Sequence, residues 1–141
     1  MEPALLESYR NACYELHLST GPVVLKVDQP CHELGELLSS AGVSGAALLT
    51  AYNPGSIQHT FAQNDAAQRK LKLRLLREGH TLTPATAIDP AGQWPHEPGL
   101  LVMGISFADA LSAARDFQQL AFLWCNASAV PLLIETDQTA R

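Results

Sequence analysis

Two short proline-containing segments carry side chains that could bind a ligand. The first, Asn53-Pro54-Gly55-Ser56, ends an apolar run. Pro54 pushes Asn53 toward extended backbone, and Gly55 can take the positive φ of a type II turn. Ligands of α/β sheets bind outside the carboxyl ends of strands. There Asn53 and Ser56 would offer donors and acceptors, and free backbone N–H groups could meet an anion. Alternatively, the polar groups of the turn bond only their own backbone.

The second segment reads QWPHEP, from residue 93 to residue 98. Two prolines bracket His96 and Glu97, so a stiff backbone would display both side chains. Trp94 offers a flat apolar surface with one N–H donor. His96 and Glu97 could act as acid and base, which makes Glu97 a candidate, although the sequence assigns no catalytic residue. Alternatively, Trp94 packs as a lid on the core and Glu97 pairs with a nearby cation.

The net charge is −5, but the basic residues are concentrated in one stretch. Five of the nine lie between Arg69 and Arg77 without an acid among them, so 4 basic and 14 acidic residues remain for the rest of the chain. On a helix, Lys70, Arg74 and Arg77 lie on one face and could contact an anion or an acidic protein partner. Alternatively, this is a solvated face whose cations suit a helix C-terminus. The overall acidity argues against nucleic acid as a partner.

Several classes of chemistry find no motif in the sequence. There is no P-loop, G-x-G-x-x-G, G-x-S-x-G or H-E-x-x-H, and no cofactor is expected. His32 and Glu36 lie four residues apart without a third ligand, so no metal is expected. Cys13, Cys31 and Cys125 are far apart and are expected to be reduced. No apolar run approaches the roughly 20 residues of a membrane helix, and no secretion signal is visible, so a cytoplasmic protein is expected.

The surrounding pattern predicts a single α/β or α+β domain, with a mixed β-sheet covered by about three to four helices. The domain would span residues 1–141, with residues 137–141 as a flexible tail. Helices are predicted at about 3–11, 28–42, 64–78 and 106–117, and strands at 13–18, 23–27, 43–51, 81–88, 100–105, 121–125 and 130–136.

Single residues set some of these boundaries. Helix caps are expected from Asp28, from Thr60 or Asn64, and from Ser106 with Asp109. Pro84 interrupts the strand at 81–88 and marks it as an edge strand. Phe107 begins an apolar stripe at helical spacing and is expected to face the core.

Several different short motifs are spaced along much of the chain: Thr50-Ala51-Tyr52-Asn53-Pro54, Asn64, Trp94, Glu97-Pro98, Gly104, and Phe117 before Gln119. Together they resemble a family of small bacterial proteins named domain of unknown function 3293. The resemblance runs from about Tyr9 to Leu133 and implies a fold and a site position, but no activity. The polar residues that it implies for ligand binding are Thr50, Asn53, Ser56, Asn64, Gln68, Trp94, Glu97 and Gln119.

The chain departs from the family pattern at three positions. Gly99 stands where the family usually has Ser, and Gln118 and Leu120 stand where it usually has Gly and Asn. If those groups touch a ligand, the site of this member is altered.

Three functional hypotheses follow. The first is binding of a small polar or anionic ligand in a cleft between the Asn53–Ser56 turn and the Trp94–Glu97 loop, with Lys70 and Arg74 attracting an anion. The second is a protein-interaction module that uses the basic helix face at Arg69–Arg77. The third is an enzyme in which Glu97 is the acid or base. Only the positions of these residues in space can show whether they share a cleft.

Overall fold

The chain folds into the predicted succession of helices and strands. The elements are α1 (Pro3–Asn11), β1 (Cys13–Leu18), β2 (Gly21–Lys26), α2 (His32–Ala41), β3 (Ala46–Leu49), the 3-10 turn η1 (Pro54–Ser56), α3 (Phe61–Arg77), β4 (Thr81–Ile88), β5 (Glu97–Met103), α4 (Phe107–Asp116), β6 (Ala121–Cys125) and β7 (Pro131–Glu135). The computed structural model describes residues 1–136. The predicted tail at 137–141 lies outside the described residues.

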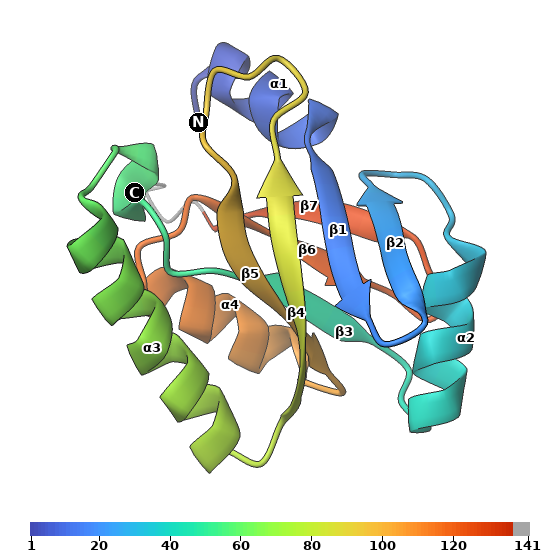
Figure 1. Ribbon diagram of the computed structural model, residues 1–141. Coiled ribbons are helices and arrows are strands. Elements are labelled where there is room, and N and C mark those ends of the chain that lie inside the picture. Colours follow the sequence, from blue (N-terminus) through green and yellow to red (C-terminus); the bar gives the residue numbers. More distant parts are fainter. Residues whose placement is uncertain (137–141) are drawn as a thin grey trace.

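The seven strands form one curled sheet in the order β2-β1-β4-β5-β3-β6-β7 (Figure 1). The fold is α+β, which is one of the two fold classes predicted from the sequence. Every pair of neighbouring strands is antiparallel, whereas the prediction was a mixed sheet. The reason is that each helical connection joins two parallel strands that are not neighbours. After α3, for example, β4 lies beyond β5 from β3, so an antiparallel strand always separates the parallel ones.

Strand β3 divides the core in two, because alternate residues point to opposite faces of a strand. Ala46 and Leu48 pack in a core that includes Leu34 and Leu38 of α2. Ala47 and Leu49 pack in a second core, against α3 and α4. Burial on both faces explains the uninterrupted apolar run of β3. In Figure 1, α3 and α4 lie at the lower left of the sheet, α2 lies at its right, and α1 lies at the top beside the β4–β5 loop.

Strand β4 lies inside the sheet, between β1 and β5, so the prediction of an edge strand is wrong. Its pairing with β1 ends at Ala85, opposite Leu16. Pro84 lies one residue beyond that pairing and faces Leu100 of β5. An interior strand therefore tolerates the missing N–H at the point where its pairing with one neighbour, β1, has stopped.

The helix starts confirm some predicted caps and correct others. The Thr60 side chain accepts from the Gln63 N–H in a capping box, so α3 begins before Asn64 and includes it. Ser106 caps α4 by accepting from the Asp109 N–H. Asp28 does not cap α2, which begins at His32 without a side-chain cap. Instead, Asp28 has a φ of 67° and forms an ion pair with Arg10.

Phe107 is 40% exposed, so its predicted place in the core is wrong. Its ring lies over the rim of the second core, 6.0 Å from Phe122 and 5.4 Å from Trp124 between ring centroids. As the first residue of α4 it lies at the end of the buried stripe. No helix within residues 1–136 is long and apolar enough to cross a membrane. Cys13, Cys31 and Cys125 are free thiols.

Candidate functional site

The turn after β3 closes as predicted but begins differently. The Ser56 N–H donates to the Asn53 carbonyl at 2.9 Å, and Gly55 has a positive φ of 69°. Asn53 has a φ of 47°, so the predicted extended backbone before Pro54 is wrong. The N–H of Gly55 donates to the Gln118 carbonyl at 2.7 Å. The turn therefore offers an anion no free N–H at Asn53, Gly55 or Ser56, since the Asn53 N–H is also occupied.

Asn53 is held by Asn64 through a reciprocal pair of hydrogen bonds. The Asn53 N–H donates to Asn64 Oδ1 at 2.8 Å, and Asn64 Nδ2 donates to Asn53 Oδ1 at 2.9 Å. The His59 N–H also donates to Asn53 Oδ1, at 3.0 Å. Two backbone donors therefore fix the orientation of both amides. Both side chains are buried, so this pair secures the turn and leaves Asn53 Nδ2 pointing elsewhere as a donor.

That donor meets the carboxylate of Glu97. Asn53 Nδ2 donates to Glu97 Oε2 at 2.8 Å. Within residues 1–136 the other oxygen, Oε1, has no hydrogen bond, and no cation forms an ion pair with Glu97. Burial of the half-buried side chain raises the pKa of Glu97, and the bond from Asn53 offsets this only in part. The expected pairing of Glu97 with a cation is therefore not found in the described residues.

Thr50 and Gln68 hold the chain that leads into the turn. Thr50 Oγ1 donates to the Pro98 carbonyl at 2.8 Å and accepts from the Tyr52 N–H at 3.1 Å. Gln68 Oε1 accepts from the Ala51 N–H at 2.8 Å. These bonds connect the end of β3 to the start of β5 and to α3. They place Asn53 and Glu97 together although 44 residues separate them.

Gln119 approaches the same corner from the other side. Its Nε2 donates to the Tyr52 carbonyl at 3.0 Å and to the Phe117 carbonyl at 3.3 Å. The side chain is only 7% exposed, and its Oε1 accepts no hydrogen bond from residues 1–136. A buried carbonyl oxygen without a donor costs free energy unless water or a ligand supplies one.

These groups surround a cavity of about 110 Å³ at the end of the sheet where α1 and the β4–β5 loop lie. A water molecule needs roughly 10–15 Å³, so the cavity has room for several waters or a small ligand. Six of the predicted ligand-binding residues line it: Thr50, Asn53, Ser56, Trp94, Glu97 and Gln119. Asn64 and Gln68 do not line it and act on the backbone around it.

Two tyrosines from the N-terminal segment complete the cavity, and the sequence analysis missed both. Tyr9 Oη lies 2.7 Å from Ser56 Oγ, and Tyr14 Oη donates to the Tyr9 carbonyl at 3.0 Å. Burial raises the pKa values of both Tyr9 and Tyr14 above the ordinary tyrosine value. The alternation of Tyr14, Leu16 and Leu18 with Glu15 and His17 in β1 is the sequence signal that could have indicated an inward-facing Tyr14. Nothing in the sequence indicated that α1 would lie over the turn at Ser56.

The loop that carries Trp94 is organised by Asp89 as well as by its prolines. The Asp89 carboxylate accepts from the N–H groups of Ala91, Gln93 and Trp94 at 3.0, 2.9 and 3.1 Å. Trp94 lines the cavity and is half-buried. His96 is exposed and does not line the cavity. The structure therefore does not bring His96 and Glu97 together at one cavity.

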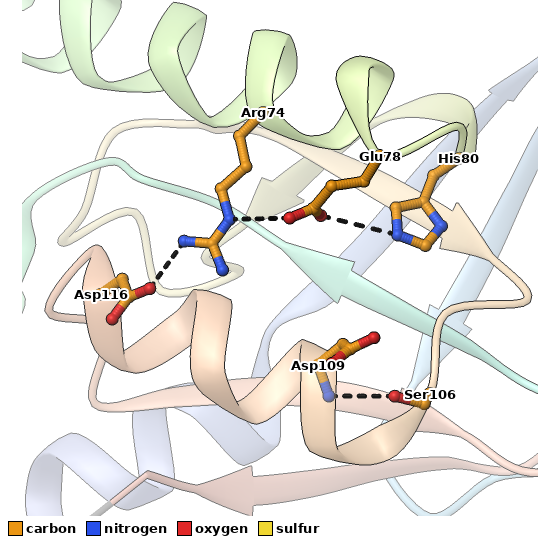
Figure 2. A network of polar contacts seen from close by, with 6 residues as sticks. All are labelled: Arg74, Glu78, His80, Ser106, Asp109 and Asp116. Atoms are coloured by element: carbon orange, nitrogen blue, oxygen red, sulfur yellow. Dashed lines mark hydrogen bonds and ion pairs between the residues drawn. The ribbon is translucent and has the colours of Figure 1, made fainter.

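The basic stretch lies away from the cavity, since Lys70, Arg74 and Arg77 are not among its lining residues. Figure 2 shows Arg74 between two acids, with Asp116 of α4 at 2.7 Å and Glu78 at 3.4 Å. The pair with Asp116 joins α3 to α4, and the two acids raise the pKa of Arg74, mainly through the bond to Asp116. Lys70 and Arg77 are exposed.

Comparison with protein families gives one match, to the family described as "Protein of unknown function (DUF3293)", over residues 49–122. The chain belongs to the DUF3293 family. Comparison with curated proteins gave no match, and neither did comparison with solved structures. The matched DUF3293 segment contains all the predicted ligand-binding residues, whereas Tyr9 and Tyr14 lie before it.

The structure places the departures from the DUF3293 pattern. Gly99 lines the cavity, and a Cβ at this position would lie 3.3 Å from the Leu49 carbonyl oxygen, so a side chain would fit only tightly there. Gln118 has a φ of 56°, in the region that glycine occupies at little cost, which explains why Gly suits this position.

Proposed function

We propose that this DUF3293 protein binds a small polar ligand in the cavity between α1, the Asn53–Ser56 turn and the Trp94 loop. The observation that carries the proposal is the Glu97 carboxylate beside the cavity, which has one oxygen held by Asn53 and the other without a partner among residues 1–136. A carboxylate that served only the fold would be expected to have both oxygens satisfied, because an unpaired buried charge is costly.

The walls of the cavity support the same proposal. Most ligand sites combine apolar and aromatic walls with a few polar groups that fix orientation. Here Tyr14, Trp94 and Leu133 provide apolar surface. Glu97 and Gln119 each have an oxygen to which no group of the described chain, residues 1–136, donates. The anionic alternative has little support, because Lys70 and Arg74 lie elsewhere and the N–H groups of the turn are occupied.

A fragment screen by NMR tests the proposal on the intact, ¹⁵N-labelled protein. Ligands should shift the side-chain amide signals of Asn53 and Gln119 and the indole N–H signal of Trp94. The indole signal of Trp124, which does not line the cavity, is the internal control. The proposal fails if fragments of diverse chemistry leave the three cavity signals unchanged, or if all of them shift signals of α3 instead.

The exposed side of α3 favours a second candidate function, the docking of an acidic protein partner. Leu73 is 50% and Leu76 is 49% exposed, and Lys70 and Arg77 are exposed on the same helix. Charge reversal by Lys70→Glu and Arg77→Glu should abolish association with such a partner and leave fragment binding at the cavity unchanged. Arg74 is unsuitable for this test because it holds α4.

Enzymatic use of Glu97 as acid or base has less support. His96, its expected companion, is exposed and outside the cavity. The hydroxyl pair of Tyr9 and Ser56 is the other polar group that could take part. Catalysis would require turnover that Glu97→Gln abolishes and that Tyr9→Phe alters.

A further inference from the structure

We propose that the ligand of this cavity carries a protonated amine on a small apolar body. The inference deepens the proposed function and rests on it. The charged and polar groups that line the cavity indicate whether the ligand is a cation, a neutral molecule or an anion. This evidence does not depend on the overall charge of the chain.

The cavity has carboxylates but no cation. Two acidic residues, Asp89 and Glu97, line it, and no Lys, Arg or His of residues 1–136 does. The other titratable side chains on its wall are Tyr9, Tyr14 and Tyr52. Tyrosines are neutral at neutral pH. An anionic ligand would therefore meet like charge without a compensating side chain.

Of the two carboxylates, only Glu97 is available to a ligand. The oxygens of Asp89 accept three backbone N–H groups within its own loop. Glu97 accepts a single bond, to Oε2 from Asn53, which leaves Oε1 for a donor from the cavity. A cation beside this oxygen would also offset the cost of holding the carboxylate away from water.

A second, independent acceptor lies in the same lining. Gln119 is 7% exposed, and its Nε2 is committed to the Tyr52 and Phe117 carbonyls, which leaves Oε1 without a donor in residues 1–136. An ammonium group has three donors and no acceptor. It matches a wall that presents Glu97 Oε1, Gln119 Oε1 and the acceptor capacity of the Tyr9–Ser56 hydroxyl pair.

The aromatic walls suit both parts of such a ligand. Tyr14, Tyr52 and Trp94 line the cavity together with aliphatic side chains such as Leu48 and Leu133. Aromatic faces attract cations, and their carbon surface packs an apolar body. Neutral alcohols could use the same acceptors, but they lack the charge that pairs with Glu97.

Matched probes that differ mainly in charge test the inference on the full chain. Benzylamine, benzyl alcohol and benzoate are titrated into ¹⁵N-labelled protein, and so are hexylamine, hexanol and hexanoate. Binding is read from the Asn53, Gln119 and Trp94 side-chain signals. The amine of at least one series should bind about tenfold more tightly than its alcohol, because charge-assisted hydrogen bonds are the stronger ones, and the carboxylate should bind most weakly.

Two variants locate the charge that the amine meets. Glu97→Gln keeps the shape of the side chain and an oxygen for Asn53, and it should remove most of the tenfold preference while leaving alcohol binding nearly unchanged. Glu78→Gln changes the net charge equally at an exposed position outside the cavity and should leave the preference intact. If Glu97→Gln fails to fold, the preference of the wild-type protein for amines over alcohols and carboxylates still tests the inference.

Two outcomes overturn the inference in distinguishable ways. If in neither series the amine binds at the cavity signals more tightly than its alcohol and its carboxylate, the cationic class is wrong and the proposed function stands. If no member of either series shifts these signals, the cavity fails as a site for small ligands of this size, and the proposed function fails together with the inference.

Discussion

Glu97 and Arg74 differ in the hydrogen-bond and ion-pair partners that the protein provides for them. Arg74 lies at the surface between α3 and α4 with an acid on each side, Glu78 and Asp116 (Figure 2). Glu97 is half-buried beside a cavity, and within residues 1–136 it has one neutral donor, Asn53. In the sequence the basic stretch was the stronger electrostatic feature. The comparison teaches that a dense cluster of charge is weak evidence for a site, because the charges of a cluster can neutralise one another.

The largest effect should come from Asn53→Ala. The substitution removes the acceptor of Asn64 Nδ2 and of the His59 N–H and the donor to Glu97, and it puts alanine at a φ of 47°. We expect a loss of about 2–4 kcal/mol in the free energy of unfolding, measured by urea denaturation. Asn11→Ala is the control, since Asn11 is exposed and makes one bond to Glu7. Equal losses in the two variants would show that Asn53 does not secure the corner.

A second prediction concerns pH, because Glu97 binds its proton more tightly in the folded than in the unfolded chain. Its ionisation therefore opposes folding, and stability should fall as pH rises from the ordinary glutamate value to the raised value. Glu97→Gln should remove this part of the pH dependence and be more stable than the wild type above that window. The measurement is the urea midpoint against pH for both proteins, and identical profiles would contradict the unpaired state of Glu97.

Other titratable groups on the same wall should not obscure this result. Tyr9 and Tyr14 have pKa values raised further above the neutral range. Asp89 lies in the β4–β5 loop and is common to the wild type and the variant. The difference between the two profiles therefore isolates Glu97.

The surface cluster should matter less than the corner. Arg74→Ala removes ion pairs to Glu78 and Asp116 in a partly exposed setting, so it should cost about 0.5–1 kcal/mol. The control Lys72→Ala removes an exposed cation from the same helix and should cost close to nothing. A loss from Arg74→Ala as large as that from Asn53→Ala would remove the contrast between the two regions.

The smallest effect is expected at Gln118, an exposed residue with a φ of 56°. Gln118→Gly should stabilise the protein by about 0.5 kcal/mol, because glycine takes this conformation without the cost that other residues bear. A substitution by glycine in the interior of α4, Ser112→Gly, should destabilise the protein by a similar amount. If the two variants change the midpoint of thermal denaturation in opposite directions, the positive φ of Gln118 is supported. Changes in the same direction contradict it.

Local signals predicted most of the elements but not the pairing of the strands. Hydrophobic period and cap residues gave the order of helices and strands, because both act within a few residues of the chain. Pro84 misled because its effect depends on where the pairing of β4 with β1 stops, which is a property of the sheet. Asp28 misled because a cap needs a particular backbone geometry, and that residue has a positive φ.

The candidate site was predicted as a set of residues but not as an arrangement. Thr50, Asn53, Ser56, Trp94, Glu97 and Gln119 were named from their types and from the family resemblance, and they do line one cavity. Their roles differ in ways that no spacing reveals. Asn64 and Gln68 use their amides on backbone, and Tyr9 joins through a helix that the sequence does not connect to the turn.

The central claim is that Glu97, whose Oε1 has no hydrogen bond from residues 1–136, binds a cationic donor. The most direct measurement is the titration of its side-chain carboxyl by carbon-detected NMR, with and without saturating benzylamine or hexylamine. The account predicts a pKa above the ordinary glutamate value in the free protein and a lower pKa when the amine is bound. A pKa at the ordinary value that does not respond to either amine would contradict the account.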